Sequence, residues 1–302
     1  MSRFLACVFA LLMAAGSPAA ADTFHMTNGV SFDGVVLQEN PDGTMKVQAG
    51  NNVLVYRKSE IEQVEKNDKT GKFDKEAALA EWAKEDAALT EATGLNAAQR
   101  AQVKALLFKL MRGEDTERLT ARDRLVALQG EMDVFRYLAY ELPGMAYTAF
   151  PYVLDAMFII DPGRTLPHLR DSVANQAPAA RAKAIELLGK ARDITSLLMV
   201  ARGLVDPDEE VRIMAAYALA NLGAKQASPA LIDGLKHPDL RVNNASREAL
   251  QALWKNEVGD QKLTTPEEWT AFWQAHAGTV SSVIETSALT PLVDPEVPFV
   301  AG

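Results

Sequence analysis

The sequence predicts a mainly α-helical fold: about four to five stacked helix pairs, preceded by a small five-stranded β module. The observations behind this are a 31-residue repeat in the C-terminal half, apolar residues at helical spacing, and short alternating runs near the N-terminus. Of 302 residues, 48% are hydrophobic and 24% charged, as in a folded globular protein. The formal net charge of −9 argues against a nucleic-acid partner, since such binders normally present a basic face.

Residues 1–21 have the pattern of a cleavable signal peptide. Arg3 precedes an apolar run, Phe4–Ala15, that is too short to span a bilayer, and Ala19–Ala21 fits a small-residue cleavage site. The alternative is a buried N-terminal helix. Cleavage after Ala21 would remove Cys7, the only cysteine, so the mature chain would hold no thiol and no disulfide. We expect a protein exported to the periplasm or secreted, with no membrane span after cleavage, and the signal is of bacterial type.

Residues 22–67 alternate between short β-prone runs and turn residues. Asn28-Gly29, Asn40-Pro41-Asp42-Gly43 and Gly50-Asn51-Asn52 are residue types that favour tight turns. Five short strands in so little chain predict an SH3-like barrel or a curled sheet. The layout resembles an N-terminal module of bacterial envelope proteins. Such a module can bind a peptide or a glycan, or it can serve as a cap on the helices that follow.

Residues 68–113 are expected to form a helical connector, in which Asn96 caps a helix. From residue 114 to 278 the chain repeats with a period of 31. Pro207-Asp208 recurs as Pro238-Asp239, and Ala218-Leu219 recurs as Ala249-Leu250. The repeats are clear over 176–268, weaker over 145–175 and degenerate over 114–144. Because one helix pair cannot bury its apolar face, several must stack.

Residues 206–219 resemble the first helix of a HEAT repeat, of the short type found in phycobilisome-lyase-like proteins. Residues 221–223 then match the turn, and 229–236 the second helix. The resemblance implies a curved, right-handed solenoid of helix pairs. Either Asp206 or Asp208 is expected to cap the first helix, with Pro207 in its first turn. The next copy departs from the pattern, since Asn243 stands where Arg212 stands in this one.

The residues around Thr265 predict where the last helix of the solenoid begins. Thr265, Pro266 and Glu268 predict a capping box with proline at the first helical position. Trp269, Phe272 and Trp273 follow on one face. We expect these aromatic side chains to cap the exposed end of the stack; the alternative is an aromatic ligand platform. Residues 279–302 contain Pro291, Pro295 and Pro298 without helical spacing, and are expected to form a tail that lies on the surface or moves freely.

The sequence predicts no catalytic residues, no metal site and no cofactor. It contains no G-x-S-x-G elbow and no glycine-rich phosphate loop. The histidines also lack the H-E-x-x-H spacing of zinc enzymes, and each is expected to be structural or solvated. They are His25, His168, His237 and His276. His237 is expected to serve in a turn or cap, and adjacent carboxylates such as Glu209-Glu210 are expected at helix starts.

One column of polar residues is a candidate partner-binding site. Asp171, Arg202 and Asp233 lie one period apart, on the exposed side of successive second helices. Stacking would align them on the inner, concave face. They could pair with one another, or they could form a polar groove for a partner helix or strand.

These features predict a non-enzymatic protein–protein interaction or scaffold module of the bacterial cell envelope. Its partner would be another envelope protein, and the chain itself could be monomeric. Two alternatives stay open. One is a bilin-lyase-like enzyme or accessory subunit, as the phycobilisome-lyase resemblance implies. The other is glycan or peptide binding by the β module.

Overall fold

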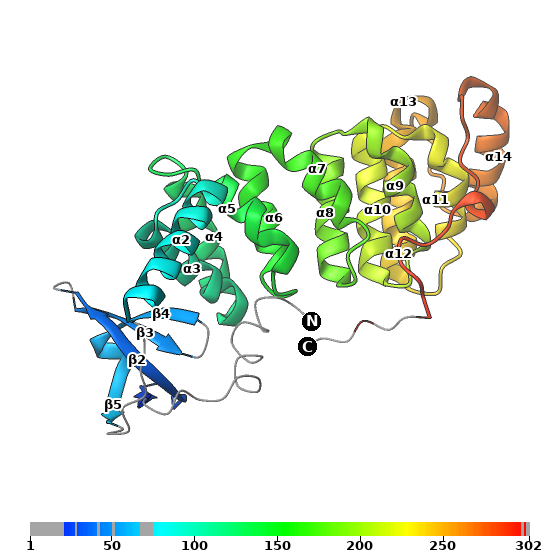
Figure 1. The fold of residues 1–302 in the computed structure, drawn as a ribbon. Coiled ribbons are helices and arrows are strands. Elements are labelled where there is room, and N and C mark those ends of the chain that lie inside the picture. Colours follow the sequence, from blue (N-terminus) through cyan, green and yellow to red (C-terminus); the bar gives the residue numbers. More distant parts are fainter. Residues whose placement is uncertain are drawn as a thin grey trace. The chain divides into compact units, whose positions relative to one another are not determined.

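The computed structural model describes residues 21–27, 29–40, 43–49, 52–66, 75–296 and 299, without the side chains of 52, 75–79, 81 and 82. The chain divides into two compact units, residues 1–100 and 101–302 (Figure 1). The signal-peptide prediction lies outside the described residues, apart from Ala21.

The first unit begins with one antiparallel five-stranded sheet of order β4-β3-β2-β1-β5. Its strands are β1 (Asp22–Met26), β2 (Ser31–Glu39), β3 (Thr44–Ala49), β4 (Asn52–Arg57) and β5 (Ile61–Glu65). A short 3₁₀ turn, η2 (Lys58–Glu60), joins β4 to β5. The five predicted strands are confirmed. The outer strands β4 and β5 do not pair with each other in the described sheet, so it stays open rather than closing into a barrel.

A small aromatic core holds the sheet together. The rings of Phe24 and Phe32 stack at 5.3 Å, and those of Phe32 and Tyr56 at 5.2 Å. Gly34 is required where β2 crosses β3, because a Cβ there would lie 2.6 Å from a methyl of Val47. Gly29 has a φ of 81°, which fits its predicted turn. The other turn residues Asn28, Pro41, Asp42, Gly50 and Asn51 lie outside the described residues.

Two helices follow, α2 (Lys75–Thr93) and α3 (Ala97–Arg112). The predicted cap at Asn96 is confirmed, because its side chain accepts a hydrogen bond from the backbone N–H of Gln99 at 3.0 Å. The side chain of Gln99 in turn accepts one from the backbone N–H of Asn96 at 3.0 Å. The buried Arg100 fixes the corner between the helices. It pairs with Asp86 and donates to the hydroxyl of Thr90 at 2.9 Å.

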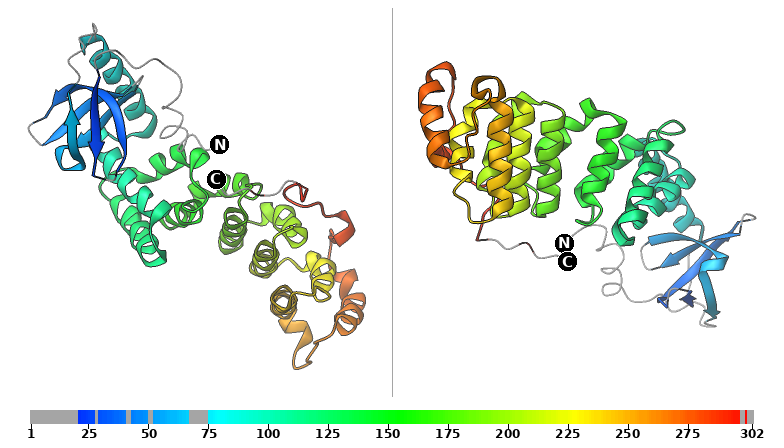
Figure 2. Two further views of the ribbon diagram at one scale, coloured as in Figure 1. Left: turned by 90° about the horizontal axis from the view of Figure 1, so that it is seen from below. Right: turned by 180° about the vertical axis from the view of Figure 1, so that it is seen from behind.

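The described residues of the second unit form five helix pairs, within the predicted range of about four to five. The first helices are α4 (Asp115–Leu128), α6 (Phe150–Ile160), α8 (Pro178–Lys190), α10 (Glu209–Leu222) and α12 (Leu240–Leu253). The second helices are α5 (Val134–Glu141), α7 (Pro162–Ser172), α9 (Leu197–Arg202), α11 (Ser228–Gly234) and α14 (Pro266–His276). Consecutive first helices contact one another from α4 to α12, as Figure 2 shows. The shortest second helix, α9, is extended by 3₁₀ turns, η4 (Ile194–Ser196) before it and η5 (Gly203–Val205) after it.

Small residues let the first helices approach closely. Ala215, Ala216 and Ala218 of α10 are all buried. A Cβ on Gly189 of α8 would lie only 2.6 Å from the Cα of Ala218. Because that neighbour is backbone, it cannot move aside, and the contact between α8 and α10 depends on the absence of a side chain at residue 189.

Helix α10 is capped by Asp208, whose side chain accepts from the N–H groups of Glu210 and Val211 at 3.0 and 3.2 Å. The expectation that Pro207 lies in the first turn is wrong. Pro207 precedes the cap, since the helix begins at Glu209. Asp206 instead forms an ion pair with Arg181 of the preceding repeat. Its carboxylate also accepts a hydrogen bond from the N–H of Asp208 at 3.0 Å.

The C-terminal end of the stack is rich in aromatic contacts. The predicted capping box is confirmed: Thr265 accepts from the N–H of Glu268 at 3.2 Å, and Glu268 accepts from that of Thr265 at 2.9 Å. Phe272 and Trp273 meet the buried Trp254 edge-on at 5.5 and 6.0 Å. A short helix, α13 (Lys255–Val258), separates α12 from α14. Among the described residues, no helix is both long and apolar enough to cross a membrane.

Candidate functional site

The described residues of the C-terminal tail, 280–296 and 299, lie across the face formed by the second helices, which we call the second-helix face. It leaves α14 through the turn η7 (Ala277–Thr279), passes α11 and then reaches α9, so it runs against the order of the repeats (Figures 1 and 2). One 3₁₀ turn, η8 (Thr286–Ala288), contacts α11. At its far end the ring of Phe299 meets Tyr147 edge-on at 5.5 Å. The tail was expected either to lie on the surface or to move freely, and its described residues lie on the surface of the solenoid.

Arg202 holds the middle of the tail. Its Nε donates to the carbonyl of Thr290 at 2.9 Å, and its Nη2 donates to the carbonyl of Pro291 at 2.8 Å. An arginine fork matches two acceptors at this spacing, and charged donors make stronger hydrogen bonds than neutral ones. Arg202 is therefore a clamp on the peptide backbone.

Asp233, one period later, holds the start of the tail. Its carboxylate accepts from the hydroxyl of Thr286 at 2.6 Å and from Lys236, in the turn just after α11, at 2.9 Å. Burial acts to raise the pKa of Asp233, but the hydrogen bonds from Lys236 and Thr286 outweigh it, so the pKa lies below its usual value. The carboxylate thus stays charged and accepting at neutral pH.

Two leucines anchor the tail by burial. Leu289 and Leu292 are both buried, although the segment around them is mostly exposed. Beyond them, the tail borders a small hollow of about 210 Å³ between itself and the solenoid. The hollow is lined from the repeats by Gln176, Pro178, Arg181, Pro207 and Asp208, and from the tail by Val293, Asp294, Pro295 and Phe299.

The three residues of the candidate column have different surroundings. Arg202 and Asp233 each bind the tail. Asp171, at the end of α7, is exposed and makes no polar contact of this kind within the described residues. The sequence predictions missed the tail as the occupant of this face. The available signal was Leu289 and Leu292 on either side of Thr290-Pro291, because the residue before a proline favours an extended conformation.

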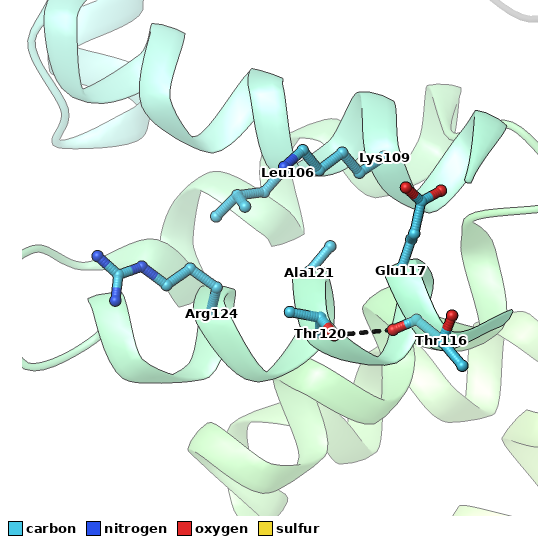
Figure 3. A pocket seen from close by; sticks show the side chains of 7 residues that line it. All are labelled: Leu106, Lys109, Thr116, Glu117, Thr120, Ala121 and Arg124. Atoms are coloured by element: carbon cyan, nitrogen blue, oxygen red, sulfur yellow. Dashed lines mark hydrogen bonds between the residues drawn. The ribbon is translucent and has the colours of Figure 1, made fainter. Parts of the chain in front are cut away.

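A second hollow, of about 300 Å³, lies between α3 and α4 (Figure 3). Leu106 and Lys109 of α3 border it on one side. The remaining lining residues all come from α4 and are Thr116, Glu117, Thr120, Ala121 and Arg124. The hydroxyl of Thr120 donates a hydrogen bond to the carbonyl of Thr116 at 2.8 Å, so it is not oriented into the hollow as a nucleophile. Its lining holds one acidic and two basic side chains but no histidine or cysteine.

Other reactive groups are dispersed. Nowhere in the described part of the chain do three histidine, cysteine or acidic side chains gather to hold a metal ion. The prediction for His237 is confirmed, since its Nδ1 accepts from the N–H of Asp239 at 3.0 Å in the turn before α12. His25 contacts the hydroxyl of Ser31 at 2.7 Å, and His276 stacks on Phe272 at 4.1 Å.

The comparisons with known proteins agree with the geometry of the helical part. The family model described as HEAT repeats matches residues 166–251, which run from α7 to α12. Comparison with curated proteins gives no match. The matched segment contains Arg202 and Asp233, and the helix pairs on both sides continue the same stacking. Residues 166–251 therefore match HEAT repeats, and the helix pairs on both sides extend them as a HEAT-like α-solenoid.

Proposed function

We propose that the protein is a non-enzymatic interaction module of the bacterial cell envelope, which binds a partner protein on the second-helix face. HEAT repeats generally mediate protein–protein interaction, and helical solenoids present extended binding surfaces. The observation that carries the proposal is the tail: Arg202 and Asp233 hold a stretch of polypeptide on this face. A surface that binds one peptide through backbone carbonyls and a hydroxyl has the chemistry to bind another.

The placement in the envelope rests on the signal-peptide pattern of residues 1–21, and the absence of a catalytic role remains a prediction. Export is tested directly by cell fractionation and by N-terminal sequencing of the mature chain. The expected result is a periplasmic or secreted protein that begins at Asp22. Retention in the cytoplasm with Met1 intact would remove the envelope from the proposal.

The partner is tested by crosslinking in cells, followed by pull-down of the tagged full-length protein and mass spectrometry. The face variant carries Asp171→Ala, Arg202→Ala and Asp233→Ala together. A matched control carries three exposed substitutions away from this face, Glu85→Ala, Lys255→Ala and Asp260→Ala. We expect a stoichiometric partner that the wild type and the control capture and the face variant loses. Equal capture by all three forms, or capture of no protein, would overturn the proposal.

A further inference from the structure

We propose that the second-helix face recognises an extended, uncharged segment of the partner that contains leucine and proline, and that the C-terminal tail occupies this face as an internal competitor. This inference rests on the proposed function, because both place the partner on the same face. It adds the chemical class of the bound segment and the way its access is regulated.

The hydrogen bonds to the tail backbone could be made by any polypeptide segment that follows the same path across the face. Arg202 binds two successive carbonyls, of Thr290 and Pro291, and the N–H of Ile284 donates to the carbonyl of Gln226 at 2.8 Å. None of these bonds uses a side chain of the tail. Pro291 fixes its own φ and disfavours a helical conformation at Thr290, so the segment stays extended where Arg202 holds it.

The side-chain contacts define the preferred sequence. Leu289 and Leu292 are buried on either side of Pro291, and the hydroxyl of Thr286 donates to Asp233 at 2.6 Å. Residues 286–293 include no charged residue. The face therefore selects the pattern Thr-x-x-Leu-x-Pro-Leu, because an acidic or basic side chain in place of either leucine would lose its hydration without gaining a partner.

The tail leaves part of the face open. Leu198 lies one helical turn before Arg202 on α9 and is 59% exposed, and Ile194 one turn further is 54% exposed. Asp171 is exposed one repeat earlier. Neighbouring exposed apolar side chains on one helix are typical of an interaction surface. A partner segment can contact Leu198 and Ile194 first and then displace the tail from Arg202.

The start of the tail carries strain that favours release. Ser282 has a φ of 56°, in the left-handed region that residues other than glycine rarely adopt. This position is where the chain turns from the last helix back onto α11. Because the strain is relieved when the tail detaches, it lowers the free energy needed to open the face.

The test measures binding of a fluorescein-labelled synthetic peptide of residues 283–295 to the full chain by fluorescence anisotropy. The tail variant, Leu289→Ser with Leu292→Ser, weakens the internal competitor without changing the face. We expect the tail variant to bind the peptide at least tenfold more tightly than the wild type, because a larger fraction of molecules has an open face. A peptide with both leucines replaced by serine is the negative control.

Two further variants locate the binding. Adding Arg202→Ala to the tail variant should weaken peptide binding about tenfold, whereas adding Lys255→Ala should leave it unchanged. Circular dichroism must show the same helical content in all forms, so that lost binding reflects the face. Equal peptide affinity in the wild type and the tail variant would overturn the role of the tail as a competitor. Absence of binding to both would overturn the recognition of an extended segment.

A second copy of the chain is the rival occupant, and light scattering distinguishes it. Dimers of the wild type that disappear in the tail variant would mean that tails are exchanged between copies, which would overturn the assignment to a partner protein. The crosslinking experiment separates this inference from the proposed function. A partner captured through the face by a protein that never binds the peptide would refute the inference alone. Arg202-dependent peptide binding without any captured protein would refute the proposed function alone.

Discussion

Arg181 and Asp206 form a buried, two-pronged ion pair that joins α8 to the start of the next repeat. The Nε–Oδ2 and Nη2–Oδ1 distances are 2.9 and 2.7 Å, and neither side chain is more than 2% exposed. The remaining nitrogen of Arg181 donates to the carbonyls of Asn175 and Gln176, both at 2.9 Å. The pair therefore satisfies its own hydrogen bonds while it fixes how two layers of the solenoid meet.

Replacing Arg181 by alanine should destabilise the protein by about 3–5 kcal/mol, because it leaves the carboxylate of Asp206 buried without a partner. The measurement is the midpoint of urea unfolding. Arg241→Ala is the matched control. Its side chain is 62% exposed, so solvent screens its pairs with Glu209 and Asp239, and their loss should change stability little. Similar unfolding midpoints for the two variants would show that the buried ion pair contributes no more to stability than an exposed one.

The same arrangement is incomplete one repeat later. Arg212 matches Arg181 and donates to the carbonyls of Asp206 and Pro207, but its buried Nε has no acceptor among the described residues. His237 stands at the position that matches Asp206, and like Asp206 it accepts from the N–H two residues later. The repeat thus keeps the turn and lacks the carboxylate.

His237→Asp should therefore stabilise the protein by about 1 kcal/mol, because it gives the Nε of Arg212 a charged acceptor, in addition to the ion pair with Glu209 at 3.7 Å, while keeping the turn. Differential scanning calorimetry would show a higher Tm. His237→Asn keeps a similar acceptor for the turn without the charge and should leave Tm nearly unchanged. A gain of equal size in the asparagine variant would trace the effect to the loss of histidine instead.

Gly189→Ala should destabilise the protein by about 1–3 kcal/mol, because the new Cβ would overlap the backbone of Ala218 and push α8 from α10. Gly130 offers a control. A Cβ there would meet only the carbonyl of Ala127 at 3.7 Å, an ordinary contact. Gly130→Ala should be neutral or slightly stabilising. Chemical unfolding measures the stability of both variants. A Gly189→Ala protein as stable as the wild type would mean that α8 and α10 can move apart with little loss of stability.

Asp193 should make stability depend on pH in the acid range. Two hydrogen bonds from Arg170, both 2.9 Å, lower its pKa from 3.8 to about 2 against the opposing effect of burial, with help from Ser196 and Thr195. Because the folded pKa lies below the unfolded one, this contribution is complete above about pH 4 and is lost as the pH falls toward 2. At 1.36 kcal/mol per pKa unit it amounts to at most about 2 kcal/mol.

Asp193→Asn tests that contribution through urea unfolding at a series of pH values between 2 and 7. The variant should be less stable than the wild type at pH 7, and the difference should shrink as the pH approaches 2. A difference that stays constant over the whole range would assign the loss to packing rather than to the charge.

The helix pairs could be predicted because their signals are local and repeated. Caps such as Thr265 and turns such as Asn221-Leu222-Gly223 depend on residues within a few positions of one another, and Gly223 adopts the left-handed φ of 69° that ends α10. For the cap of α10 the sequence left Asp206 and Asp208 as alternatives, and the structure selects Asp208. An aspartate before a helix is compatible with capping, and only the packed neighbour shows that its carboxylate serves Arg181 instead.

The site was predicted in part. The 31-residue spacing placed Arg202 and Asp233 on the exposed side of successive second helices, and the structure finds both there. Their occupant could not be derived, because the tail has no period and its docking depends on residues more than 50 positions away. The open form of the β sheet is likewise set by whether its outer strands meet, which no short motif encodes.

The tail also makes contacts of high sequence separation with the solenoid. Arg202 meets Thr290 and Pro291 across 88 and 89 residues, whereas stacked repeats otherwise touch their immediate neighbours. Contacts of such high sequence separation form late, since the intervening chain must first be ordered. The tail is also synthesised after the repeats. A nascent chain therefore passes through a stage in which the repeats are folded and the face is bare, and the tail covers the face only once it has itself been made.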